Sequence, residues 1–142
     1  MLQDILVPVD GSVSAGRAAR WGAFLASETK ARITFLFVYD AGAASSMGFK
    51  ALTAEQLELA KQSVAKGSFD QAREQAKEFD VEKRYEIVVG HPQSEILGWV
   101  QQHHPQLIVM GTRGLSPLRE ILLGSVSDFV ARHAPCPVTL VR

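Results

Sequence analysis

Segments typical of strands and segments typical of helices alternate along the whole chain, and this alternation constrains the fold more than any other feature. Five runs rich in β-branched, aliphatic and aromatic residues are expected to form strands: 4–9, 32–40, 82–89, 106–111 and 136–142. Small and apolar residues at helical spacing predict helices between them: 13–29, 53–79, 90–104 and 125–134. This alternation predicts an α/β protein with an open, mostly parallel sheet and helices on both faces.

Local signals mark the expected helix ends. Thr53 and Gln56 have the spacing of a capping box. Ser14 is expected to cap the first helix, and Pro92 stands in a first helical turn, where its missing N–H costs little. On the long helix that follows Thr53, the apolar positions, Val64 among them, are expected to face the sheet.

Charge and cysteine content narrow the class of protein. Fifteen basic and fifteen acidic side chains give the 142 residues a formal net charge of zero, so the chain has no general attraction for nucleic acid or for an anionic membrane. Cys136 is the single cysteine, which rules out an internal disulfide and fits a reducing compartment. No apolar run approaches the roughly 20 residues of a membrane helix, and the first residues do not resemble a secretory signal. We expect one domain, 1–142, in the cytoplasm.

Residue patterns that carry catalysis or hold a metal are not found. The four histidines form no i, i+4 pair and no cysteine–histidine spacing of a zinc site. The chain has no P-loop and no G-x-S-x-G nucleophile elbow. Cys136 has no base beside it in the sequence and is expected to be a small buried residue. We therefore expect no metal ligands and no catalytic residues.

The segment from Gly111 to Ser125 is the strongest functional signal. Gly111 and Gly114 follow the fourth strand, and Gly124 with Ser125 opens the last helix. Glycine lets the backbone approach a ligand closely, and a helix N-terminus presents free N–H groups and about half a positive charge. We expect N–H groups from the turn after the strand and from the first turn of the helix to converge on a phosphate. For the glycines alone, the alternative is ordinary turn chemistry.

The expected sheet points to the same place. In an open parallel sheet, ligands bind beyond the carboxyl ends of the strands, where the strand order reverses. With the order 3-2-1-4-5 that point lies between the first and fourth strands, whose ends carry Asp10 and Met110. Aspartate also favours turns for its own sake. Arg113 and Arg119 would neutralise phosphate charge, or they are ordinary solvated loop residues.

The spacing G-x2-G-x9-G-S from Gly111 to Ser125 resembles the nucleotide motif of the universal stress protein family. ILVPVDGS at 5–12 resembles the first strand and turn of that family, FVYD at 37–40 the end of its second strand, and 111–142 its closing segment. The resemblance covers the whole chain. It implies one Rossmann-like, adenine nucleotide alpha hydrolase-like domain with five parallel strands in the order 3-2-1-4-5, in which motif-bearing members bind ATP.

The resemblance also implies roles for single residues. Those expected at the adenosine are Pro8, Val9, Asp10, Val38 through its backbone, and Met110 on the ribose side. Those expected around the phosphates are Gly111, Gly114, Gly124, Ser125 and Val126, with Arg113 as a candidate for charge neutralisation. Because a P-loop lysine is missing, a triphosphate is expected to bring Mg²⁺, held mainly by its own oxygens and by water.

The chain is therefore expected to be a nucleotide-binding stress-response protein, a sensor or regulator with at most slow ATP hydrolysis. ATP, ADP and AMP remain open as the ligand. Two alternatives are an interaction module of the same fold without nucleotide, and an adenylyl-transfer or pyrophosphate-cleaving enzyme. The family is often dimeric, and the apolar last strand is expected at a sheet edge, where two copies would pair antiparallel into a homodimer.

Overall fold

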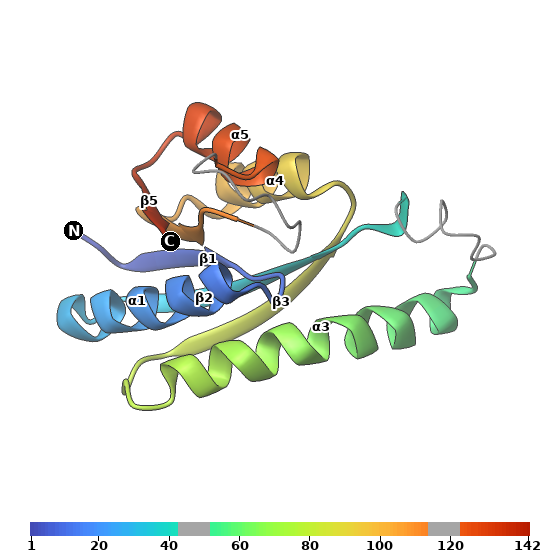
Figure 1. The fold of residues 1–142 in the computed structure, drawn as a ribbon, viewed down its shortest axis with the longest axis horizontal. Helices are drawn as coiled ribbons and strands as arrows, with labels where there is room; N and C mark the ends of the chain where they lie inside the picture. The colour runs from blue at the N-terminus through green and yellow to red at the C-terminus, as the bar shows by residue number, and fades with distance from the viewer. Residues whose placement is uncertain (43–51, 114–122) are drawn as a thin grey trace.

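The computed structural model describes residues 1–42, 52–113 and 123–142. Its strands are β1 (Asp4–Pro8), β2 (Arg32–Tyr39), β3 (Lys83–Val89), β4 (Leu107–Gly111) and β5 (Val138–Val141), and its helices are α1 (Val13–Thr29), α3 (Ala54–Ala76), α4 (Pro92–His103) and α5 (Ser125–His133). The strands form one parallel sheet in the order β3-β2-β1-β4-β5, which confirms the predicted fold class (Figure 1). No helix of the described residues has both the length and the apolar character needed to cross a membrane.

Helices cover both faces of the sheet (Figure 1). α1 and α3 pack on one face, over a core that includes Val7 and Phe35. α4 and α5 pack on the other face, over Leu6 and Leu36. Neighbouring residues of a strand point to opposite faces, so each central strand supplies both cores. These four side chains are completely buried, and each such burial stabilises the fold by about 1.5–3 kcal/mol.

α1 lies close to the sheet because small residues form much of its buried face: Ala15, Ala18, Ala19, Gly22, Ala23 and Ala26. A Cβ on Gly22 would come within 2.8 Å of Val7 Cγ2. The helix is capped by Ser12, whose Oγ accepts from Ala15 N at 3.2 Å. The expectation that Ser14 is the cap is wrong, because the helix already begins one residue before it.

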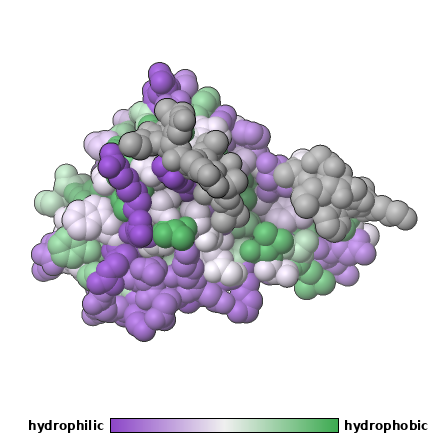
Figure 2. All heavy atoms as spheres, viewed as in Figure 1, coloured by the Kyte–Doolittle hydropathy of each residue, from purple (hydrophilic) through white to green (hydrophobic). Residues whose placement is uncertain are grey.

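The capping box predicted for α3 is confirmed. Gln56 N donates to Thr53 Oγ1 at 3.2 Å, and Thr53 N donates to Gln56 Oε1 at 3.0 Å. The expectation that Val64 faces the sheet is wrong, since 55% of it is exposed, whereas its neighbour Ala65 is buried. The outward face carries charged pairs such as Lys66 with Asp70, and Figure 2 shows hydrophilic side chains along the lower edge, where α3 runs.

A crevice opens where β1 and β4 separate. β1 pairs with β2 over its whole length, whereas its pairing with β4 ends at Leu6↔Ile108. Asp4 O accepts from Gln106 N at 3.1 Å, so the even-numbered residues of β1 face β4. Pro8, the next even residue after Leu6, has no N–H to donate to β4. We infer that this proline helps to end the ladder and to part the two strands at their carboxyl ends.

Candidate functional site

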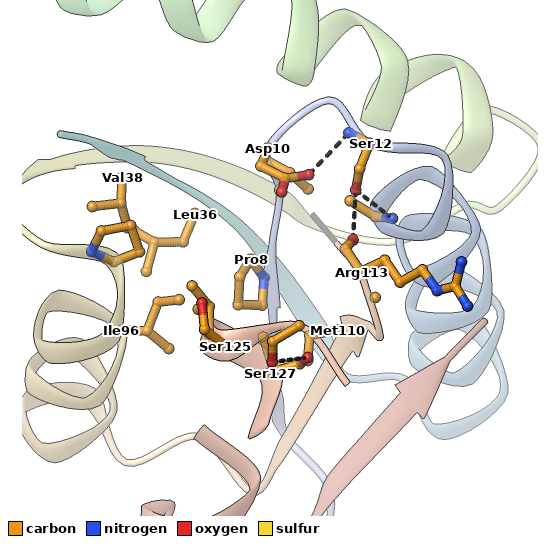
Figure 3. A pocket seen from close by; sticks show the side chains of 16 residues that line it. Pro8, Asp10, Ser12, Leu36, Val38, Ile96, Met110, Arg113, Ser125 and Ser127 are labelled. Atoms are coloured by element: carbon orange, nitrogen blue, oxygen red, sulfur yellow. Dashed lines mark hydrogen bonds between the residues drawn. The ribbon is translucent and has the colours of Figure 1, made fainter. Parts of the chain in front are cut away.

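The crevice between β1 and β4 contains a cavity of about 310 Å³ (Figure 3), a size found among small-molecule sites. The residues that line it are Pro8, Val9, Asp10, Ser12, Ala15, Leu36, Val38, Pro92, Ile96, Met110, Gly111, Arg113, Gly124, Ser125, Val126 and Ser127. Every predicted site residue that the structure describes is among them. Gly114 lies outside the described residues.

Several lining residues were not predicted: Ser12, Ala15, Leu36, Pro92, Ile96 and Ser127. Two of them carry a signal in the sequence. Leu36 precedes Val38 by two positions and so shares its side of the strand, and Ser127 belongs to the same first helical turn as Ser125. Pro92 and Ile96 lie on α4, where no motif marks them, and only the tertiary fold brings them to the cavity.

A tight turn joins β1 to α1 at one wall of the cavity. Gly11 has a φ of +85°, a conformation that glycine adopts without steric cost. Ser12 N donates to Asp10 Oδ1 at 2.9 Å, which is the local bond that favours aspartate in turns. Asp10 therefore holds the turn and also lines the cavity, so both interpretations of this residue remain.

β2 presents an unpaired stretch of backbone to the same space. Ile33 N donates to Glu82 O at 2.9 Å and Tyr39 O accepts from Gly90 N at 2.9 Å, so the odd-numbered residues of β2 face β3. The N–H and C=O of Val38 therefore point to the other side, beyond the end of β1, and no described residue bonds to them. An adjacent donor and acceptor of this kind suit the hydrogen-bonding edge of a heteroaromatic base.

The first turn of α5 forms another wall. Gly124 caps this helix without a side-chain hydrogen bond, and Asp128 N is the first amide bonded within it, to Gly124 O at 2.9 Å. The N–H groups of Ser125, Val126 and Ser127 have no acceptor among the described residues. Three free donors at the positive end of a helix suit an anion.

In the turn after β4, the two described amides are used within the protein. Thr112 N donates to Val141 O at 2.9 Å, and Arg113 N donates to Ser14 Oγ at 3.2 Å. The expectation that the amides of this turn converge with those of α5 is wrong for these two, because each is bonded within the protein. Within the described residues, α5 supplies the free amides of the predicted phosphate site.

Both ends of the connection from β4 to α5 are fixed. Gly124 N donates to Thr112 O at 2.7 Å, and Ser127 Oγ lies 3.1 Å from the same carbonyl oxygen. Ser14 Oγ donates to Arg113 O at 2.7 Å. These bonds hold the start of α5 against the end of β4, so the free amides of α5 have a fixed position in the cavity wall.

Gly111 is required for packing. A Cβ at this position would collide with Ser14 Oγ and would lie 2.7 Å from two backbone atoms, Ala15 N and Ser14 C. Backbone atoms of a helix cannot swing aside as the end of a side chain can. The glycine therefore lets β4 meet the N-terminus of α1, a reason that is separate from its expected contact with phosphate.

Arg113 is the basic residue of the described cavity lining. Figure 3 shows its guanidinium turned away from Ser125 and Ile96. Its expected role in neutralising phosphate therefore requires a different side-chain conformation, and the described anion-directed donors are those of α5. Arg119, the other arginine considered, lies outside the described residues.

The described cavity offers hydrogen-bond donors and apolar walls. In residues 1–42, 52–113 and 123–142, no three His, Cys, Asp or Glu side chains gather as metal ligands would.

Cys136 is partly buried, and burial raises the pKa of its thiol. At neutral pH this thiol is therefore protonated, which is its less reactive form.

The sequence model of one protein family, described as "Universal stress protein family", matches residues 1–142 of this chain. The universal stress protein YxiE of Bacillus subtilis is 32% identical, and the alignment covers 100% of both chains. The universal stress protein MJ0531 of Methanocaldococcus jannaschii is also 32% identical, over 100% of this chain and 83% of its own length. Among solved structures, the universal stress protein UspA from Lactobacillus plantarum has a TM-score of 0.80 and 28% identity, covering 99% of this chain and 97% of that chain.

Further solved structures that resemble this chain contain nucleotides. A universal stress protein in complex with cAMP has a TM-score of 0.69 and 24% identity, covering 99% of this chain and 96% of that chain. A universal stress protein family protein from Arabidopsis thaliana with AMP bound has a TM-score of 0.66 and 23% identity, covering 98% of this chain and 90% of that chain. The universal stress protein from Archaeoglobus fulgidus in complex with dAMP has a TM-score of 0.71 and 19% identity, covering 100% of this chain and 98% of that chain. At these identities the likeness shows a shared fold.

Proposed function

This chain belongs to the universal stress protein family, and we propose that it binds an adenine nucleotide, ATP with Mg²⁺ first among the candidates, in the cavity between β1 and β4. One observation carries the proposal: the unpaired backbone of Val38 and the free amides of Ser125, Val126 and Ser127 border the same cavity. The first suits an adenine edge and the second suits a phosphate. The nucleotides held by relatives of the same fold support the choice of adenine.

The lining residues take their proposed roles from this arrangement. Val38 would bond the adenine through its backbone, and Pro8, Val9 and Met110 would supply apolar surface around the nucleoside. Asp10, which already shapes its turn, would meet the ribose. Around the phosphates we place Gly124, which caps α5, and Ser125 and Val126 from its first turn. Gly111, Arg113 and Gly114 join them, as expected from the sequence motif.

Binding without efficient chemistry is the activity that we propose. The residues that line the described cavity include one carboxylate, Asp10, and no histidine, cysteine or lysine. Asp10 already accepts from Ser12 N, and a general base would have to reach the attacking water. We therefore propose a sensor or regulator of stress responses in the cytoplasm, with at most slow ATP hydrolysis.

Calorimetric titration with ATP, ADP and AMP, with and without Mg²⁺, tests this proposal. We expect saturable binding of at least one of them below millimolar concentration, and mass spectrometry of the purified protein checks for a nucleotide that copurifies. Absence of binding to all three would favour the interaction module without a ligand. Multiple turnovers at ordinary enzyme rates, about 1 s⁻¹ or faster, would favour the adenylyl-transfer or pyrophosphate-cleaving alternative.

Substituting Val38→Pro is expected to weaken adenosine and ATP binding about tenfold or more, because it deletes one N–H donor and fills its place with a ring. The fold is expected to survive, since this N–H is not bonded to β3 or β1. The matched control is Phe37→Pro, which removes a donor that faces β3 and should prevent cooperative folding. Unchanged affinity in a folded Val38→Pro variant would contradict the adenine contact.

The homodimer is also a proposal. β5 is an edge strand of the sheet, and Thr112 N donates to Val141 O, so the odd-numbered residues of β5 face β4. The N–H of Leu140 therefore points outward, where a second β5 would pair antiparallel. We expect light scattering to show a dimer at micromolar concentration and Leu140→Pro to give a folded monomer. A parent protein that stays monomeric under these conditions would remove the dimer.

A further inference from the structure

Gln71 on α3 contacts the turn between β1 and α1, although 59 residues separate it from Ser12. Its Nε2 donates to Ser12 O at 3.1 Å and lies 3.4 Å from Gly11 O. The same turn carries Asp10 and forms one wall of the cavity. A helix that does not line the described cavity therefore reaches the cavity wall through one side chain.

The other end of this carboxamide is unusual. Gln71 Oε1 is buried and has no hydrogen-bond partner in the described part of the chain, which is unfavourable for a polar atom. Exchanging its amide nitrogen and oxygen would set an oxygen against two carbonyl oxygens, which is worse. A leucine or methionine would avoid the unpaired oxygen altogether. What glutamine adds at this position is a donor for the turn.

α1 leaves room for this side chain. A Cβ on Gly16 would lie 2.9 Å from Gln71 Nε2 and 3.0 Å from its Cδ. Any larger residue at position 16 would push the carboxamide aside. Both the glycine on α1 and the glutamine on α3 therefore serve the same contact with Ser12 O.

The turn depends on contacts from outside because its own backbone is little constrained. Gly11 adopts a φ of +85° and has a wide choice of other conformations. Ser12 is the central member: its N–H donates to Asp10 Oδ1 and its Oγ donates to Arg113 O at 3.2 Å. Gln71 bonds the carbonyl of that same residue. The contact thus connects α3 with Asp10 on one side and with the end of β4 on the other.

We propose that Gln71 is a positioning residue, which fixes the Asp10–Ser12 turn in the geometry that accepts the nucleotide and thereby couples binding to the position of α3. The effect on binding rests on the proposed function. The effect on the turn does not, since the hydrogen bond to Ser12 O is present without any ligand.

Gly16→Ala is the most informative variant, because it displaces the carboxamide while improving the helix propensity of α1. We expect ATP affinity to fall about fivefold or more in this variant and in Gln71→Met, because both lose the hydrogen bond from Gln71 to Ser12 O. Gln71→Glu keeps the shape but sets a carboxylate against two carbonyl oxygens, and it should lose the most. Gln62→Met, on the exposed face of α3, is the control and should bind as the parent does.

Hydrogen exchange in the nucleotide-free protein gives a second, independent readout. The Ser12 amide should exchange several-fold faster in Gly16→Ala and Gln71→Met, while the midpoint of thermal unfolding of Gly16→Ala stays the same or rises. In the double variant Gly16→Ala with Gln71→Ala, the Gly16 change should have no further effect. Unchanged exchange at Ser12 together with additive effects would overturn the positioning role. If the parent binds no nucleotide, the proposed function fails, while the exchange data still decide the role of Gln71.

Discussion

Gly111→Ala is expected to destabilise the protein by about 3 kcal/mol, near the upper end of what overpacking costs. The new Cβ would stand 2.7 Å from Ala15 N and from Ser14 C. Both atoms belong to the backbone of α1, so the end of β4 and the helix must move apart. For a chain of this size, such a loss corresponds to roughly 10 °C in the midpoint of thermal unfolding.

Moving β4 away from α1 in Gly111→Ala should also affect binding. It would pull Ser14 Oγ away from Arg113 O, a contact of 2.7 Å that fixes the start of the connection to α5. Nucleotide binding should therefore weaken even in the fraction that stays folded. Chemical denaturation and calorimetric titration on the same sample measure both effects.

The control for this variant is Gly67→Ala. Gly67 lies in the interior of α3, and no described atom outside the neighbouring turns of this helix lies within 4 Å of a Cβ built there. Alanine should therefore stabilise the protein by about 0.5–1 kcal/mol through helix propensity alone. If Gly111→Ala were as stable as the parent, the close approach of β4 to α1 would not exist in solution.

Ser125→Glu is expected to separate binding from stability. A carboxylate in the first turn of α5 interacts favourably with the helix dipole, and the free energy of unfolding should rise by about 0.3–1 kcal/mol. The same carboxylate would occupy the wall where we place the phosphates, and its repulsion should lower ATP affinity about hundredfold. Adenosine, which has no phosphate, should bind as it does to the parent.

Ser125→Gln serves as the uncharged control and should cost ATP affinity far less, since the backbone N–H groups remain. Titrations with ATP and with adenosine at two salt concentrations check the electrostatic origin, because salt screens the repulsion in part. Equal losses for ATP and adenosine would mean that Ser125 lies at the nucleoside. No loss for either would remove the phosphate from α5.

If Val38→Pro and Ser125→Glu bind nucleotide as expected, three separately positioned parts of the protein form the nucleotide site. The β1–α1 turn would hold the nucleoside from one side, the backbone of β2 the base, and α5 the phosphates. Gln71 would make the first part sensitive to α3. A regulator needs a connection of this kind between its ligand and an outer surface, and α3 presents its charged face to solvent.

Local order in the sequence predicted the elements well. The span 13–29 expected for the first helix coincides with α1, and the capping box of Thr53 and Gln56 has both of its bonds. These elements were predictable because periodicity and capping depend on a few neighbouring residues. The alternation of strands and helices then predicted the fold class. Val64 was misplaced since the buried stripe of a half-exposed helix shifts with its packing partner.

The candidate site was predicted in its position and only in part in its geometry. Glycine spacing and the strand order indicated the crevice, and the predicted residues that the structure describes line one cavity. The sequence could not predict the hydrogen-bond partner of a single N–H group. Arg113 N, for example, bonds to Ser14 Oγ, and these residues are 99 positions apart. The cap at Ser12 was missed for a similar reason, as two serines compete within three residues and the turn decides between them.

The sequence by itself determined which segments become strands and helices, their parallel arrangement, and the end of the sheet where a ligand would bind. Its patterns are local or repeat along the chain, so the sequence shows them directly. Only the tertiary structure decided that Gly111 makes room for α1, that α4 supplies Pro92 and Ile96, and that Gln71 reaches Ser12. Each of these depends on a close approach between residues far apart in the chain, and the distance between such atoms is set by the packing of whole elements.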